Sequence, residues 1–302
     1  MNATVTPREL QRLLAGDTVT LIDVLLPEDF ACRHIAGAGN ACVYEMVFLE
    51  RVAELVPNRE RPVVVYDESG ATLSASDARG KLERAGYRSV AVLAGGLRGW
   101  RAAGLAVETG VPAPPAPTVR DGRYRIDTGQ SVLEWTGRNI GKRHYGRIAL
   151  SGGEVVVTNG LPASGRLVLD MNTISDLDLE DEGWRGMLHR HLKSDDFFDV
   201  ERYPEVVFEL HGATLIAGAT PGAPNVEIAG SLTIRETTRS ISFPAILAAQ
   251  EDGSLKAQAA LDFDRTLWGV CYGSGRLYER LGMHLVNDLI SVEVFLTARR
   301  PG

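Results

Sequence analysis

Apolar residues in the first hundred positions alternate between short strand-like runs and segments of helical spacing. Short apolar runs predict buried strands, and apolar residues three or four positions apart predict helices. In chain order the predicted elements are a helix that ends at Gly16, a strand over 19–24, a helix near 45–55, a strand over 63–66, a helix over 74–85 and a strand over 90–93. Such alternation is typical of a parallel sheet with flanking helices, so we predict an α/β domain.

The first helix carries a recognisable start signal. Thr6 can cap it, Pro7 suits the first helical position, and Glu9 completes a capping box.

Apolar residues in the second half recur at every second position instead. The clearest case is 166–171, where Leu167, Leu169 and Met171 share one face of a predicted strand. The same phasing groups Leu133 with Trp135, Val206 with Phe208 and Leu210, Leu232 with Ile234, Ile241 with Phe243, Leu261 with Phe263, and Val292 with Val294 and Leu296. We count about eight antiparallel strands, which predicts an all-β closed barrel.

The predicted barrel has small residues among the large ones on its inner face. Gly230, Ala245, Ala257 and Ala259 share the phase of the apolar residues and are expected to leave a gap along the axis. The residue types alone fit a filled core equally well.

A proline-rich segment separates the two patterns. Residues 111–117 contain four prolines and favour an extended backbone. We predict domains over 1–110 and 120–302, joined by a linker over 111–119.

Charge and cysteine content narrow the range of partners. The chain has 32 Lys and Arg against 39 Asp and Glu, a net charge of -7, which disfavours nucleic acid. It shows neither a signal-like start nor the ~20 apolar residues that span a membrane, so we expect a cytoplasmic protein. Cys32, Cys42 and Cys271 are scattered, so we expect reduced thiols. The oligomeric state stays open.

Several motifs of the first half occur in the order of a known family. They are Leu21–Val24, Pro27–Phe30, His34–Ala38, Ala94–Trp100 and Ala103–Gly104. This segment resembles the rhodanese homology domain, in which the strand ending at Tyr66 would deliver a catalytic cysteine into a loop of backbone amides.

The catalytic loop departs from that pattern. Asp67 stands where the resemblance implies the cysteine, and Leu25 stands where the family commonly has arginine. The degenerate loop comprises Asp67, Glu68, Ser69, Gly70, Ala71 and Thr72. Because a carboxylate cannot accept a sulfane sulfur, we predict a pseudoenzyme without sulfurtransferase activity. Asp67 either fills the loop with its own charge or caps the next helix, and we favour the cap.

Two alternatives for this domain stay open. Cys32 or Cys42 could act as a displaced nucleophile, or the domain could dock the barrel onto a protein partner.

The second half carries its own set of motifs. They are Tyr124–Asp127, Ser131–Trp135, His144–Gly146, Asp170–Met171, His191–Asp199 with Tyr203–Pro204, Gly230–Arg235 with Thr238, Asp264–Thr266 with Trp268–Gly269, and Leu281–Gly282 with Asp288. This half is similar to the YceI family. The resemblance implies a lipocalin-like barrel that binds a polyisoprenoid or isoprenoid quinone without covalent chemistry, and no other cofactor.

The predicted protein is therefore a binding or carrier protein for a hydrophobic amphiphile. The residues expected to contact the ligand are Leu133, Trp135, Leu167, Leu169, Met171, Phe208, Leu232, Phe243, Ala259, Leu261, Phe263, Val292 and Val294.

An acidic segment at 176–199 raises the question of a metal. Its acids Asp176, Asp178, Glu180, Asp181 and Glu182 lack the glycine and terminal glutamate of a calcium loop. His189 and His191 are two positions apart, which points them to different sides of a helix.

We therefore predict no metal site in this segment. Instead we predict a short helical lid packed through Trp184, Leu188 and Leu192. His144 and Tyr145 are candidates to anchor a ligand head group at the rim, or to make structural hydrogen bonds.

Overall fold

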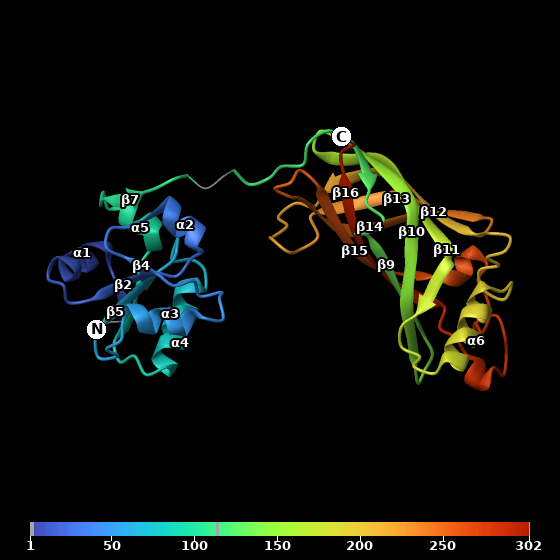
Figure 1. The fold of residues 1–302 in the computed structure, drawn as a ribbon, viewed down its shortest axis with the longest axis horizontal. Helices are drawn as coiled ribbons and strands as arrows, with labels where there is room; N and C mark the ends of the chain where they lie inside the picture. The colour runs from blue at the N-terminus through green and yellow to red at the C-terminus, as the bar shows by residue number, and fades with distance from the viewer. Residues whose placement is uncertain (1–2, 113–114, 302) are drawn as a thin grey trace. The chain divides into compact units, whose positions relative to one another are not determined.

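The computed structural model describes residues 3–112 and 115–301 (Figure 1). The chain divides into two compact units, residues 1–115 and 116–302. Residues 113 and 114 of the predicted linker lie outside the described residues.

The first unit is built on a parallel sheet, as predicted. Its strands lie in the order β1 (Thr4–Val5), β6 (Val90–Leu93), β5 (Val63–Tyr66), β2 (Thr20–Asp23) and β4 (Gly39–Asn40). A separate antiparallel pair joins β3 (Arg33–Ile35) to β7 (Val107–Thr109). The sheet places the loops that follow β2 and β5 at the same edge, because neighbouring parallel strands end together.

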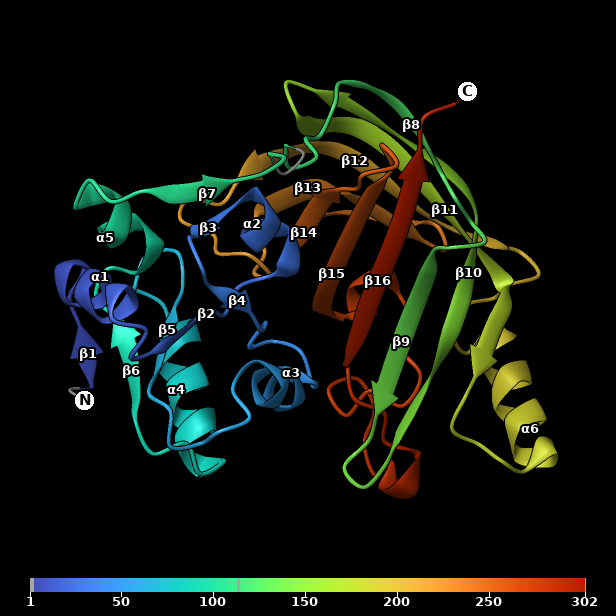
Figure 2. The same cartoon turned by 60° about the vertical axis from the view of Figure 1, so that its left-hand side comes forward.

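Helices cover both faces of this sheet (Figure 2). Val63 and Val65 of β5 pack in a core with α3 (Phe48–Leu55) and α4 (Ser74–Arg84). Val64 and Tyr66 point the other way, into a core with α1 (Pro7–Ala15) and α5 (Gly96–Ala102). Every side chain of the strand is therefore buried, which explains its continuous apolar sequence.

The start of α1 has the predicted capping box. The Glu9 backbone N–H donates to Thr6 Oγ1 at 3.3 Å, and the Thr6 N–H donates to Glu9 Oε2 at 2.8 Å. Helices α2 (Pro27–Cys32) and α5 were not predicted from the spacing of apolar residues. Both are short, and neither start has a side-chain cap.

The second unit is a closed antiparallel barrel, which confirms the predicted fold class. Its strands are β8 (Gly122–Ile126), β9 (Val132–Arg138), β10 (Arg143–Thr158), β11 (Leu161–Asp176), β12 (Glu205–Leu215), β13 (Val226–Ile234), β14 (Thr237–Ala249), β15 (Leu255–Asp264) and β16 (Leu289–Arg299). Strand β8 pairs with residues 154–157 of β10, and β9 pairs with residues 143–148. Because β8 and β9 share one position between β10 and β16, the barrel has eight strand positions.

Three helical segments accompany the barrel. Helix α6 (Glu182–Lys193) follows β11 and appears beside the end of the barrel in Figure 1, while η1 (Arg265–Trp268) and η2 (Gly282–His284) lie between β15 and β16. In the described part of the chain, no helix has both the length and the apolar character needed to cross a membrane.

Candidate ligand-binding site

A cavity of about 320 Å³ lies inside the barrel and has a predominantly apolar wall. All thirteen side chains predicted to contact a ligand line this cavity. Its volume falls within the roughly 300–1,000 Å³ of small-molecule pockets. The residues named from the alternating pattern thus share one wall, and their contact with a ligand stays a prediction.

The cavity is elongated along the strands. Leu255, Ala257, Ala259, Leu261 and Phe263 of β15 all line it, at every second position. At ~3.3 Å per residue, the stretch from 255 to 263 extends over about 26 Å. The shape therefore suits a chain-like ligand better than a compact one.

Three of the four predicted small residues contribute to the cavity wall. Ala245, Ala257 and Ala259 line it. The prediction was wrong for Gly230, because the Phe208 ring already occupies the space that a Cβ there would take. Gly230 accommodates an aromatic side chain rather than opening the axis.

Helix α6 contributes to one end of the cavity. Leu188 and Leu192 line it, as predicted for a lid. Trp184 was wrongly placed in that contact, since it is 63% exposed. The Asp181 side chain accepts the Trp184 backbone N–H at 2.9 Å and so caps the helix at this residue.

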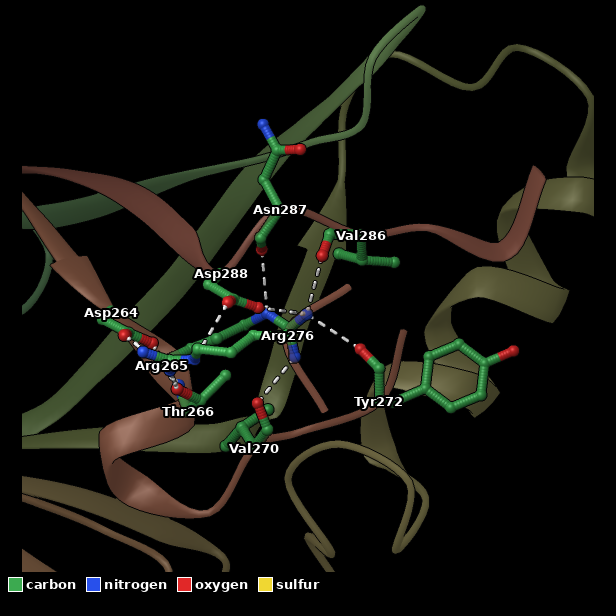
Figure 3. Close-up of polar contacts among 9 residues, drawn as sticks. All are labelled: Asp264, Arg265, Thr266, Val270, Tyr272, Arg276, Val286, Asn287 and Asp288. Atoms are coloured by element: carbon green, nitrogen blue, oxygen red, sulfur yellow. Dashed lines mark hydrogen bonds and ion pairs between the residues drawn. The ribbon is translucent and has the colours of Figure 1, made fainter. Parts of the chain in front are cut away.

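A buried arginine fastens the segment between η1 and β16 (Figure 3). Arg265 is 2% exposed, lines the cavity, and donates hydrogen bonds to four backbone carbonyls. The acceptors are the carbonyls of Val270 at 2.6 Å, Tyr272 at 2.8 Å, Asn287 at 3.0 Å and Val286 at 3.1 Å.

The electrostatic setting of Arg265 suits a structural role. Burial lowers the pKa of Arg265, and the Asp288 carboxylate, 4.0 Å away, opposes that shift. Since arginine keeps its charge in proteins, the guanidinium holds this loop in place through charge-assisted hydrogen bonds.

At the polar rim, His144 lies beside two carboxylates, that of Asp176 at the end of β11 and that of Asp178 two positions later. Its Nδ1 lies 3.0 Å from Asp178 Oδ2 and 3.9 Å from Asp176 Oδ2. Burial raises the pKa of Asp176. Desolvation would also raise the pKa of Asp178, but hydrogen bonds led by the Tyr145 N–H outweigh it and lower that pKa.

The two histidines of α6 have other partners. His189 Nε2 accepts the Asp176 backbone N–H at 2.8 Å, and His191 Nε2 lies 3.2 Å from Asp196 Oδ2. They diverge as predicted for helical positions two apart. His144 lines the cavity, whereas Tyr145 does not and is 37% exposed.

In the first unit, the Asp67 carboxylate fills the loop that follows β5. Its Oδ1 accepts the backbone N–H groups of Gly70 at 2.5 Å and Ser69 at 3.1 Å. Its Oδ2 accepts the Thr72 hydroxyl at 2.9 Å and the Ala75 N–H of α4 only at 3.4 Å. The shorter bonds to the loop amides favour the self-filled loop over the helix cap that we favoured from sequence.

The backbone around this loop is closely packed. Gly96, with φ of +55°, lies against the Asp67 carbonyl, and a Cβ there would clash with it. The Leu97 N–H donates to that carbonyl at 2.8 Å. The cysteines kept as an alternative nucleophile lie outside the loop: Cys42 is buried and Cys32 is half-buried at the end of α2.

A model of the YceI-like domain matches residues 124–298, more than half of the chain. The chain belongs to the YceI-like family. A model of the rhodanese-like domain matches residues 6–103, so this YceI-like protein carries a rhodanese-like domain ahead of its barrel.

Similar solved structures cover each unit of the YceI-like chain. BcnA from Burkholderia cenocepacia is 20% identical with a TM-score of 0.45, and the match covers 57% of this chain and 98% of BcnA. A polyisoprenoid binding domain from Saccharophagus degradans is 14% identical with a TM-score of 0.46, covering 59% and 98%. A thiosulfate sulfurtransferase from Pseudomonas aeruginosa is 35% identical with a TM-score of 0.33, covering 36% and 20%.

Curated relatives match about a third of the chain. The HTH-type transcriptional regulator Rv0324 of Mycobacterium tuberculosis is 36% identical over 108 residues, which are 36% of this chain and 46% of the regulator. The uncharacterized protein YibN of Escherichia coli K12 is 31% identical over 106 residues, or 35% of this chain and 72% of YibN. This chain thus spans less than half the length of the first relative.

Sequence reasoning missed the polar part of the YceI-like cavity. Arg138, Asn139 and Lys142, at the turn between β9 and β10, line it together with Arg265. The basic residues flanking Asn139-Ile-Gly141 were a usable signal, because a hairpin turn places its flanking residues at the end of a barrel. Arg265 was recognised only as part of a motif, since periodicity does not show which carbonyls surround it.

Proposed function

We propose that the barrel is a carrier for a hydrophobic amphiphile, a polyisoprenoid or an isoprenoid quinone. The observation that supports this most is the apolar wall that continues along alternate residues of both β15 and β16. Membership of the YceI-like family points the same way. The Saccharophagus degradans structure is described as a polyisoprenoid binding domain.

The energetics of an apolar tunnel are sufficient for such a ligand. Each buried methylene contributes ~0.8 kcal/mol, so ten contribute about 8 kcal/mol before the cost of immobilising the chain. No specific polar anchor is required for retention. The basic side chains of Arg138 and Lys142 at the cavity would accommodate a polar or anionic head group.

We further propose that the rhodanese-like domain does not transfer sulfur. Sulfur transfer would require a thiolate that attacks the donor sulfur and then carries it as a persulfide. Asp67 offers no such atom, and its carboxylate already accepts the loop N–H groups that would bind an anion. The domain would thus act through binding rather than catalysis.

The carrier function is testable by titration of the full chain after its lipids have been removed. An isoprenoid quinone added in detergent should quench the fluorescence of Trp135, which lines the cavity, and should raise the melting temperature. A Trp135→Phe variant should lose the share of the quenching that comes from Trp135, leaving that of Trp268 in the same cluster, and should keep the thermal shift. If the wild type shows neither effect while saturated polyisoprenoid alcohols also fail to stabilise it, the carrier function is wrong.

A further inference from the structure

The barrel holds a second arrangement of side chains that the apolar cavity does not explain. His144 lies near the start of β10, Asp176 is the last residue of β11, and Asp178 is two positions beyond. One atom from each, His144 Nδ1 and an oxygen from each carboxylate, lies within 4.8 Å of the other two. Strand pairing brings them together, with Gly146 opposite Asp176.

Backbone contacts fix the direction of both carboxylates. Asp176 Oδ1 accepts the Leu179 N–H at 2.8 Å, and Asp178 Oδ1 accepts the Tyr145 N–H at 2.7 Å. The other oxygen of each carboxylate, Oδ2, faces His144. Gly146 permits the close approach of the strands, because a Cβ there would collide with the Ser175 carbonyl.

One of these oxygens is buried without a partner. Asp176 is 4% exposed, and within residues 3–112 and 115–301 its Oδ2 has no hydrogen-bond partner. A buried carboxylate oxygen in that condition is costly unless a cation or a proton donor compensates it. Among the described residues, Asp176 Oδ2 thus faces His144 with no positive charge or proton donor to compensate it.

Basic side chains do not supply that charge in the described part of the chain. Neither carboxylate forms an ion pair with a lysine or arginine there; the ion-pair partner of both is His144. The nearby Arg143 guanidinium instead lies 5.2 Å from the centroid of the Tyr145 ring. With a neutral imidazole, the cluster has two negative charges. His144 Nδ1 and Asp178 Oδ2 form a hydrogen bond at 3.0 Å that a bound cation would replace, and Asp176 Oδ2 is unpartnered within the described ranges.

In contrast to the expectation from the acidic segment alone, we propose that His144, Asp176 and Asp178 bind a divalent first-row transition-metal ion, with Zn²⁺ as the reference ion. One imidazole nitrogen and two carboxylate oxygens are ordinary ligands for this class, and three protein ligands leave a position for water or another oxygen ligand. Tetrahedral coordination at ~2.0–2.2 Å separates ligand atoms by roughly 3.3–3.6 Å. The two His144 distances of 3.0 and 3.9 Å bracket that spacing. The argument for this site does not rest on a lipid in the cavity, although His144 also lines the cavity.

The test is a calorimetric titration of the EDTA-treated full chain with ZnCl₂, supported by the visible absorption of Co²⁺. We expect one saturable site per chain and a rise in melting temperature on adding Zn²⁺. His144→Gln and Asp178→Asn should each weaken binding at least about 100-fold, more than is typical for changes outside the ligand set. Both positions are partly exposed, so these variants should fold even if Asp176→Asn does not.

The matched control is His191→Gln. His191 also faces a carboxylate, Asp196 at 3.2 Å, but in the described part of the chain this pair has no third ligand residue beside it. This variant should bind Zn²⁺ like the wild type. Absence of a one-equivalent site, affinity only in the millimolar range, or equal affinity in the folded His144→Gln variant would overturn the proposal and leave a shared proton as the compensating charge.

Discussion

Ala245 of β14 lies directly opposite Ala259 of β15, and both line the cavity. Neighbouring strand positions carry Phe243 and Leu261, which are much larger. The paired alanines therefore leave open a stretch of the barrel that larger side chains would fill.

Replacing Ala259 with tryptophan should block the cavity at this point. We expect the variant to lose the binding of added isoprenoid quinone and to lose roughly 1–3 kcal/mol of unfolding free energy through overpacking. Thermal shift and denaturant unfolding of the full chain measure the two effects. Ala260→Trp is the control, since Ala260 is exposed on the same strand and should leave binding intact. Unchanged quinone binding by a folded Ala259→Trp variant would place the ligand elsewhere.

Arg265 and Arg276 offer a contrast between a buried and an exposed arginine in one loop (Figure 3). Arg265→Met should lower the unfolding free energy by about 3 kcal/mol or more, because it removes the donor of four backbone carbonyls in a buried or partly buried setting. Arg276 is 55% exposed and pairs with Asp264 at 2.9 Å. Arg276→Met should cost at most ~1 kcal/mol. Equal losses in denaturant unfolding would contradict the structural role given to Arg265.

Elements could be predicted where the apolar pattern of the local sequence matches the burial of that element in the fold. Strands β5 and β6 have the predicted bounds because both faces of the sheet are buried and their sequences are continuously apolar. The cavity wall followed from alternation, since a strand with one buried face needs period two. Helix α5 was missed because Gly96 and Gly99 interrupt the helical spacing of its apolar residues.

Features that depend on long-range contacts could not be predicted in the same way. His144 is more than thirty positions before Asp178, and only the pairing of β10 with β11 brings them together. The space over Gly230 is filled by Phe208 from the adjacent strand, which periodicity does not reveal. Trp184 is exposed although Leu188 and Leu192 of the same helix line the cavity, and the sequence does not show which part of the helix reaches the barrel.

The buried carboxyl of Asp23 should make the stability of the rhodanese-like domain depend on pH. Burial raises the pKa of Asp23 to about 6, against hydrogen bonds led by the Leu25 N–H. Between about pH 4 and 6, Asp23 is therefore protonated in the folded domain and ionised in the unfolded chain. The contribution of Asp23 is favourable below pH 4 and is lost as the pH rises through 6.

This dependence can be isolated with Asp23→Asn, which cannot ionise. The unfolding free energy of the variant relative to the wild type should rise by up to about 3 kcal/mol between pH 4 and 7, at ~1.4 kcal/mol per pKa unit. Hydrogen exchange of the β2 and β5 amides in the full chain reports on this domain separately. Parallel pH profiles for the two proteins would show that Asp23 keeps an ordinary pKa.

The rhodanese-like loop should be inactive in the wild type and only weakly active after Asp67→Cys. The new thiol would face the Ser69 and Gly70 N–H groups, but Leu25 and the altered Thr72 region differ from the pattern that the family resemblance implies. Thiocyanate formation from thiosulfate and cyanide measures this. Robust turnover by the wild type would overturn the inactive assignment, and its persistence without Cys32, Cys42 and Cys271 would exclude a cysteine mechanism altogether.

The carrier function is tested most directly by what the protein contains when it is purified. The full chain should be purified without detergent, extracted with organic solvent and examined by mass spectrometry, with the Ala259→Trp variant prepared in parallel. We predict a long-chain polyisoprenoid or isoprenoid quinone close to one molecule per wild-type chain, and a marked loss from the folded variant. An extract without such a lipid, or the same lipid at the same stoichiometry from both proteins, would contradict the proposal that this cavity holds it.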